Sequence, residues 1–457
     1  MLEKKKIIKK VMINPNRVPS EKAQHYLDLD AEYVNPVLDR YTNIVAVKGR
    51  GSYIYDINDD AYLDLGSGIA VNSLGHCHPA VVSAIQEQAS QLIHTSVTTH
   101  HTRYIELAEK LAQISPGNLD SVFLSNSGSE AVEGAVKLAR YITGRPAIIN
   151  FRGSFHGRTF MSVALTTSKL YFRERLEPLP GPIYTAPFPY TYRSIFRNDP
   201  AACAKDSLHQ LRLLLHQVVH PSQVAAMIIE PIQGEGGYVI PPPGYFAELR
   251  EIASSHGIIL IVDEVQSGFC RTGKMFAIEH EKIVPDIMVV AKGIAGGMPL
   301  SAFIAAKELT AKWAPARHGS TFGGNPVACA AALATIRVMQ EEKLDKRAEK
   351  LGSKILDRLR KFAQGRQYIG EVRGRGLMIG IEFNRPDGEP SRPITKHVMQ
   401  NCLENKLLVL NCGEHGHVIR LMPPLTISDA EAEKACEILE KCMDIKEGEV
   451  IHEQHSK

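Results

Sequence analysis

The sequence predicts an α/β fold, with a mostly parallel β-sheet in a large domain and a smaller α+β domain at the C-terminus. Between residues 121 and 305, short and continuously apolar runs alternate with longer amphipathic segments. This pattern is typical of a parallel sheet that is covered by helices on both faces. After about residue 343 the apolar runs become sparser and alternate with helical patterns. The length of 457 residues allows both domains.

Six apolar runs are predicted to form the strands of the large sheet: residues 121–125, 147–150, 225–229, 258–262, 287–291 and 301–305. Helices are predicted at residues 130–143 and 245–256, and an alanine-rich helix at 326–340. Ligands bind at the carboxyl ends of the strands in such sheets. We therefore expect the functional residues directly after these runs.

Three parts are expected along the chain. Residues 1–60 are predicted to be an N-terminal segment, with a helix and a connecting strand, that packs against the small domain. Residues 61–340 form the large domain and residues 341–457 the small C-terminal domain. Within the large domain, residues 178–221 are predicted to be a looser insertion or an excursion toward a neighbouring subunit. Residues 371–383 and 418–421 are the predicted strands of the small domain.

The composition is that of an ordinary globular protein, with 44% hydrophobic and 23% charged residues. A net charge of +3 gives no reason to expect nucleic acid or a membrane as partner. The eight cysteines include no C-x-x-C pair, which favours reduced thiols in a cytosolic protein. The basic N-terminus lacks the apolar region of a signal peptide, and no apolar run approaches the ~20 residues of a membrane span. We therefore expect a cytoplasmic location.

Two charged residues stand at the ends of predicted strands. Asp263 follows the run 258–262, and Lys292 follows the run 287–291. A charge at such a position is unfavourable unless it is paired. One interpretation is a direct salt bridge between the two. The other is that a cofactor separates them, because a desolvated lysine can form a Schiff base and pyridoxal-5'-phosphate (PLP) needs an acidic partner for its pyridinium nitrogen.

Two short motifs also follow predicted strands. Residues 127–130 (SGSE) open a helix, where backbone N–H groups bind phosphate, although a plain helix cap would look the same. Residues 155–158 (FHGR) offer an aromatic ring and an arginine that can bind a carboxylate, although loop packing is the simpler interpretation. His76 and His78 lack further ligands nearby, so no metal site is expected.

Eight ordered motifs together resemble the class III (subgroup II) PLP-dependent aminotransferases, and the pattern is most similar to the 4-aminobutyrate branch. The resemblance runs from about residue 43 to 444, and its motifs are LDLGSGIAVNSLGHCHP (63–79), SNSGSEAVEGAVKLAR (125–140), SFHGRT (154–159), IIEPIQGEGGY (228–238), IVDEVQSGFCRTGK (261–274), AKGIAGGMPLSA (291–302), HGSTFGGNP (318–326) and VIRLMPPLTIS (418–428). The resemblance implies the PLP-dependent transferase type I fold. It also implies a homodimer or a dimer of dimers, with active sites at the interface.

The resemblance also implies roles for matching residues. Lys292 would carry PLP as a Schiff base and act as general base, and Asp263 would pair with the pyridinium nitrogen. The remaining implied cofactor contacts are Gly128 and Ser129 at the phosphate, Phe155 on the ring, His156, Gln266 near the phenolic oxygen, and Thr321 at the phosphate of the neighbouring subunit. The implied substrate contacts are Ile69, Arg158 for a distal carboxylate, Arg420 for the α-carboxylate and Glu235, which masks Arg420, with Glu230 nearby.

The predicted reaction moves the amino group of 4-aminobutyrate, or a similar ω-amino acid, to 2-oxoglutarate and gives a semialdehyde and glutamate. Ile69 stands where ornithine aminotransferases resemble one another in having tyrosine, which argues against ornithine. The motif at 318–326 is common in acetylornithine aminotransferases, so that activity remains an alternative. A racemase or epimerase of the same family is another, although Arg158 and Glu235 favour transamination. A catalytically idle scaffold is the alternative of a different class, against which the intact set of Asp263, Lys292 and Arg420 argues.

Overall fold

The computed structural model describes residues 19–445. The basic N-terminal run lies among residues 1–18, outside the described residues, as do residues 446–457, so the predicted parts 1–60 and 341–457 can be followed only within these limits.

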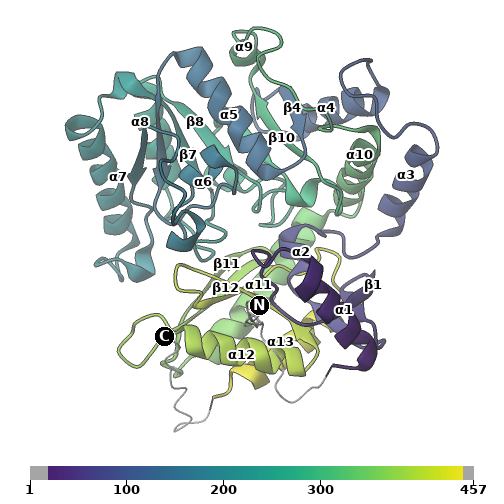
Figure 1. The fold of residues 1–457 in the computed structure, drawn as a ribbon. Coiled ribbons are helices and arrows are strands. Elements are labelled where there is room, and N and C mark those ends of the chain that lie inside the picture. Colours follow the sequence, from purple (N-terminus) through teal and green to yellow (C-terminus); the bar gives the residue numbers. More distant parts are fainter. Residues whose placement is uncertain (1–18, 446–457) are drawn as a thin grey trace, which may run out of the picture.

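A seven-stranded sheet forms the centre of the larger part of the molecule (Figure 1). Its strand order is β4-β10-β9-β8-β7-β5-β6, and all neighbours are parallel except β10, which is antiparallel to β4 and β9. The strands are β4 (Ser121–Ser125), β5 (Ala147–Phe151), β6 (Ile183–Ala186), β7 (Val224–Ile229), β8 (Ile259–Asp263), β9 (Ile287–Val290) and β10 (Ser301–Ala305). The predicted mostly parallel α/β architecture is therefore confirmed.

Helices cover this sheet on both faces. Helix α5 packs on β7, β9 and β10, whereas α4, α7 and α8 pack on β4, β6 and β8 respectively. The helices of the larger part are α2 (Ser67–Ala70), α3 (Pro79–Ala89), α4 (Thr102–Ile114), α5 (Gly128–Thr143), α6 (Phe160–Ala164), α7 (Pro200–Gln217), α8 (Tyr245–Ser255), α9 (Lys307–Thr310) and α10 (Pro326–Glu341). The six predicted strands and three predicted helices each correspond to an element, within two residues at their ends.

The prediction of a looser segment at residues 178–221 is wrong for residues 183–186 and 200–217, whereas the alternative of an excursion toward a neighbouring subunit stays a prediction. This range contains the edge strand β6 and the 18-residue helix α7. The side chain of Asp199 caps α7, and Pro200 occupies its first turn, where proline is compatible with a helix. Leu208, Leu211 and Leu215 are buried on one side of this helix, which is why it is stable despite its polar neighbours.

The smaller part combines segments from both ends of the chain (Figure 1). The antiparallel strands β1 (Ala46–Arg50), β2 (Tyr53–Asp56) and β3 (Ala61–Asp64) follow α1 (Glu21–Tyr33), and β3 pairs in parallel with β13 (Leu407–Leu408). A second sheet has the order β11-β12-β15-β14, with β11 (Ile369–Arg375), β12 (Met378–Phe383), β14 (Leu410–Cys412) and β15 (Val418–Leu421). Its helices are α11 (Leu344–Ala363), α12 (Arg392–Glu404) and α13 (Asp429–Met443). The predicted strand 371–383 is thus a hairpin, which turns at Gly376 with a φ of 56°.

A buried arginine connects the two parts. Arg271, from the loop after β8, is 1% exposed and donates to the carbonyl oxygens of Leu377 (3.2 Å) and Pro423 (2.6 Å). The N–H of Leu377 donates back to the carbonyl oxygen of Arg271 at 2.9 Å. The large sheet and the C-terminal sheet are therefore joined by reciprocal hydrogen bonds next to the site described below.

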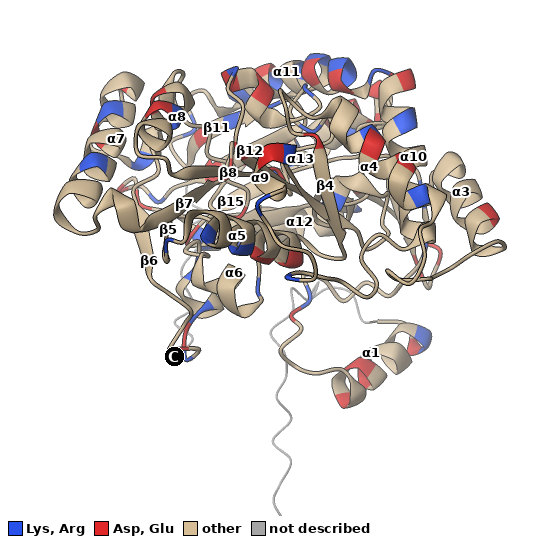
Figure 2. Cartoon of the chain, turned by 90° about the horizontal axis from the view of Figure 1, so that it is seen from above, with Lys and Arg blue, Asp and Glu red and all other residues tan. Residues whose placement is uncertain are grey.

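Charges of both signs lie on the outer helices, as Figure 2 shows for α8 and α11. Among residues 19–445, no helix is long and apolar enough to cross a membrane.

Candidate functional site

A cavity of about 350 Å³ lies at the carboxyl ends of the strands of the large sheet. Its walls include the end of β8, the residues after β9, the loop after β5 and the start of α5. Of the residues predicted from the sequence, those in its lining are Gly128, Ser129, Phe155, His156, Glu230, Glu235, Asp263, Gln266 and Lys292. Segments that are far apart in the chain thus meet where the parallel topology predicts.

Asp263 is paired with a histidine. Nδ1 of His156 and Oδ2 of Asp263 are 2.7 Å apart, and both side chains are buried. The other carboxylate oxygen accepts the N–H of Val265 at 3.0 Å. Asp263 is therefore hydrogen-bonded to His156, and the direct salt bridge with Lys292 that was considered from the sequence is not formed among residues 19–445.

Glu230 is a second buried carboxyl group beside Asp263. It accepts the N–H groups of Phe155 (3.0 Å) and Gly234 (2.8 Å) and thereby holds two loops of the cavity. Burial raises the pKa of Glu230 to about 7, with Asp263 adding to the rise. Glu230 is thus partly protonated near pH 7, which limits the negative charge next to Asp263.

Lys292 lines the same cavity as these two acids. Burial, followed by the nearby Arg420, lowers the pKa of Lys292 to about 8. Its φ of 48° lies in the left-handed region, which a non-glycine residue adopts at a cost of about 1 kcal/mol. The fold thus holds Lys292 in an unusual backbone conformation, with an amine that loses its proton more readily than an exposed lysine.

The N-terminus of α5 forms another wall. Ser127 caps this helix by accepting the N–H of Glu130 at 3.2 Å, so the plain-cap interpretation holds for Ser127 itself. The next residues, Gly128 and Ser129, face the cavity with the free N–H groups of the first turn. A Cβ on Gly128 would lie 3.1 Å from Val265, so glycine here keeps the approach to the helix terminus open.

Glu235 lies between two cations. One carboxylate oxygen accepts Nη1 of Arg420 at 2.9 Å, and the other is bonded to Nζ of Lys169. Arg420 is 2% exposed, and its Nε has no partner among the described residues. Tyr41, from the segment after α1, lies near Arg420, and burial is the main reason that the pKa of its hydroxyl is raised.

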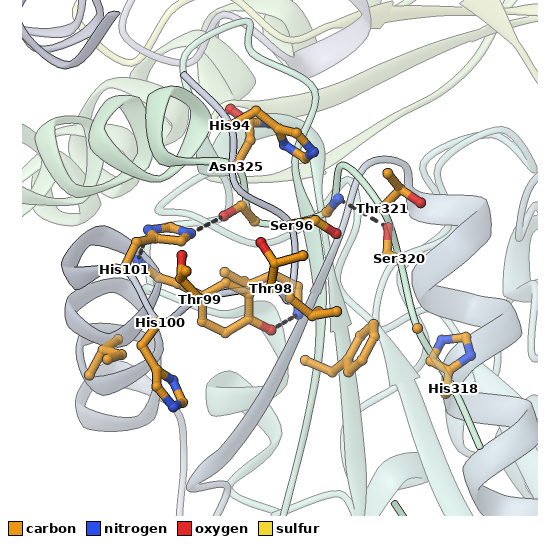
Figure 3. A pocket seen from close by; sticks show the side chains of 18 residues that line it. His94, Ser96, Thr98, Thr99, His100, His101, His318, Ser320, Thr321 and Asn325 are labelled. Atoms are coloured by element: carbon orange, nitrogen blue, oxygen red, sulfur yellow. Dashed lines mark hydrogen bonds between the residues drawn. The ribbon is translucent and has the colours of Figure 1, made fainter. Parts of the chain in front are cut away.

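Four predicted residues are not in the lining of this cavity, and one of them is Arg420, whose partner Glu235 is in the lining. Arg158 is exposed and stacks on Phe172, with its guanidinium carbon 4.4 Å from the ring centroid. Ile69 is 40% exposed, with a φ of 63°. Thr321 lies on the loop after α9, in the wall of a separate cavity lined by residues 94–105 and 318–325, where its side chain is exposed (Figure 3).

Lys169 and Tyr41 were missed by the sequence reasoning. Neither belongs to a motif with a recognisable spacing, and Lys169 meets its partner Glu235 only because the loops after α6 and β7 are adjacent. The one sequence signal for Lys169 was that it is the single charged residue in the stretch 159–172.

The arrangement fits PLP, the cofactor that the sequence resemblance implies. Lys292 supplies a primary amine for the aldehyde, Asp263 a buried carboxylate for the ring nitrogen, and the α5 N-terminus donors for the phosphate. Gln266 Oε1 and His156 Nε2 are buried without a partner in the described chain, which leaves polar capacity for a bound ligand.

The chain is similar to known proteins over most of its length. A family model described as "Aminotransferase class-III" matches residues 35–443. The chain is 39% identical to a 4-aminobutyrate aminotransferase of Mycobacterium leprae, over 88% of this chain and 91% of the relative. It is 41% identical to an acetylornithine aminotransferase of Methanothermobacter thermautotrophicus, over 91% and 98%. The crystal structure of the ornithine aminotransferase from Toxoplasma gondii superposes with a TM-score of 0.81 at 31% identity, covering 93% of this chain and 96% of that one.

Proposed function

Since the chain belongs to the class III aminotransferases, a PLP-dependent family, we propose that it moves the amino group of 4-aminobutyrate or a similar ω-amino acid to 2-oxoglutarate. The products are a semialdehyde and glutamate. The relatives named above act on different amino donors, so the choice of donor depends on the site of this chain.

The ion pair between Glu235 and Arg420 supports this choice. An arginine that is neutralised by a carboxylate at 2.9 Å does not attract the α-carboxylate of a substrate. In this state the pocket suits an amino donor without an α-carboxylate. When Glu235 leaves Arg420, the same pocket suits glutamate and 2-oxoglutarate. The two positions of one side chain therefore accommodate two substrates with different charge layouts.

The proton transfers are assigned to Lys292. Its lowered pKa allows the free amine to accept a proton near neutral pH, and its tether would keep this amine close to a bound substrate. Asp263, oriented by His156, would keep the ring nitrogen of the cofactor protonated. Bound PLP supplies the electron sink that this nitrogen controls.

The exposed loop at Thr321 supports the proposal of a homodimer. Several apolar side chains around it are exposed, which is typical of a surface that another chain covers: Ile93, Val97, Ile105 and Phe322. In the proposed dimer, Thr321 of each chain contacts the phosphate held by α5 of the partner subunit. The proposed location is the cytoplasm.

A half-reaction screen tests the proposal. PLP-loaded protein is mixed with single amino donors, and the conversion of the cofactor absorbance is followed. We expect 4-aminobutyrate or a close ω-amino acid to react, and 2-oxoglutarate to restore the original spectrum. A strong preference for N-acetylornithine, or interconversion of L- and D-amino acids without an oxo acid, contradicts the proposal.

A further inference from the structure

The second cation on Glu235 has no assigned role. The side chains of Lys169 and Glu235 are 9% and 12% exposed, and Nζ of Lys169 contacts Oε1 while Arg420 contacts Oε2. Burial opposes the charge of Lys169, but Glu235 more than offsets this effect, so the pKa of Lys169 is raised. Burial likewise opposes the charge of Glu235, and Arg420 and Lys169 together lower its pKa. All three groups are therefore charged.

The backbone at Glu235 cannot follow a large movement. Its carbonyl oxygen accepts the N–H of Gly413 at 2.8 Å. A Cβ on Gly234 would lie 2.9 Å from Gln266, and one on Gly236 would lie 2.4 Å from the carbonyl oxygen of Gly153. Release of Arg420 must therefore come from rotation of the Glu235 side chain alone.

We propose that Lys169 is a specificity-determining positioning residue, the anchor that keeps Glu235 paired after it releases Arg420 to an α-carboxylate. The carboxylate of Glu235 rotates about its contact with Lys169. It is then paired with Lys169 alone and no longer with both Lys169 and Arg420. Without Lys169, the same movement would leave a largely buried carboxylate alone, which is strongly unfavourable. Lys169 thus lowers the free energy of the state that binds glutamate and 2-oxoglutarate. The inference rests on the proposed function, because it concerns the same exchange of substrates.

The test uses single-turnover half-reactions of PLP-loaded Lys169→Met. We expect kcat/KM for L-glutamate and for 2-oxoglutarate to fall by roughly 30-fold or more, mainly through KM. The half-reaction with 4-aminobutyrate should stay within about 3-fold, because it leaves Glu235 on Arg420. Lys169→Arg should restore most of the glutamate half-reaction. Lys346→Met, which removes an exposed lysine on α11, is the matched control and should change neither half-reaction.

A double-mutant cycle with Glu235→Gln separates this role from a structural one. A neutral side chain needs no anchor, so Lys169→Met should add little loss for glutamate in the Glu235→Gln background. The inference would be overturned if Lys169→Met slowed both half-reactions equally or slowed neither. It would also be overturned if Lys169→Met caused the same loss for glutamate in the wild-type and Glu235→Gln backgrounds. If Lys169→Met does not fold, Lys169→Gln is measured in its place, with the same expected selectivity. Wild-type protein that reacts with glutamate but with no ω-amino acid contradicts the proposed function alone, because the cycle on glutamate still tests Lys169.

Discussion

The carboxylate of Asp263 lies 2.7 Å from the buried imidazole of His156, and among residues 19–445 no salt bridge joins it to Lys292. The roles proposed for Asp263 and Lys292 concern different groups of a bound cofactor, so substitutions of the two should have different effects.

Lys292→Ala should prevent covalent capture of PLP while the fold and part of the affinity for PLP remain. The α5 terminus and Phe155 do not depend on the lysine. Borohydride treatment followed by mass spectrometry checks this prediction, with wild-type protein as the positive control. A reduced PLP adduct on the variant would show that another lysine carries the cofactor.

Asp263→Ala should bind PLP more weakly and lose most of the activity, because the ring nitrogen loses its charged partner and His156 loses its own. The dissociation constant of PLP and kcat for the complete reaction provide the measurement. Turnover at the wild-type rate would indicate that a different group serves the nitrogen.

Cofactor-free Lys292→Met should be more stable than cofactor-free wild type at pH 7. The pKa of Lys292 is lowered from 10.5 to about 8, so the folded chain carries an unfavourable charge at every pH below about 8. As the pH rises toward 10.5, the folded chain loses this proton before the unfolded chain does, and wild-type stability recovers. The gain should be about 2 kcal/mol below pH 8, less than the full pKa difference because the ammonium is partly solvated. Urea unfolding across pH 7–10 measures it, and a pH-independent gain would contradict the charge as the cause.

Thr321→Ala should reduce PLP affinity, and conditions that separate the subunits should abolish activity, if each site is completed by a partner chain. Analytical ultracentrifugation combined with activity across a dilution series tests this prediction. A fully active monomer would be incompatible with the proposed dimer.

Substitutions at the three proposed substrate-binding residues should separate the two half-reactions. Arg158→Ala should damage both, because 4-aminobutyrate and glutamate place a distal carboxylate at a similar distance from the reacting nitrogen. Arg420→Ala should slow the glutamate half-reaction much more than the 4-aminobutyrate half-reaction. The loss of binding free energy should be about 3–5 kcal/mol if the α-carboxylate of glutamate is left unpaired. Glu235→Ala should slow the half-reaction with ω-amino acids and leave the half-reaction with glutamate largely unchanged. Stopped-flow absorbance resolves each case, and a uniform effect of all three would argue against a switched pocket.

The central sheet and its catalytic edge could be predicted because each depends on local sequence. Asp263 and Lys292 directly follow apolar runs, and parallel topology brings the ends of such runs together. Helix α7 was missed because proline and polar residues around it suggested a loop, whereas Pro200 in fact occupies a first turn. The pairing of Lys169 with Glu235 could not be predicted, because it depends on how two loops pack. The positions of Arg158 and Thr321 relative to a substrate or a partner chain depend on molecules outside the single chain.

The connection through Arg271 bears on how substrates enter. Its charge is satisfied by carbonyl dipoles of the C-terminal segment and not by a carboxylate, and burial lowers its pKa only to about 10. A rotation of the smaller part against the larger part would break the hydrogen bonds of the buried Arg271 guanidinium to the carbonyl oxygens of Leu377 and Pro423. Substrate exchange should therefore proceed by side-chain rotation within a rigid framework, and crystals of the protein should withstand soaking with either substrate.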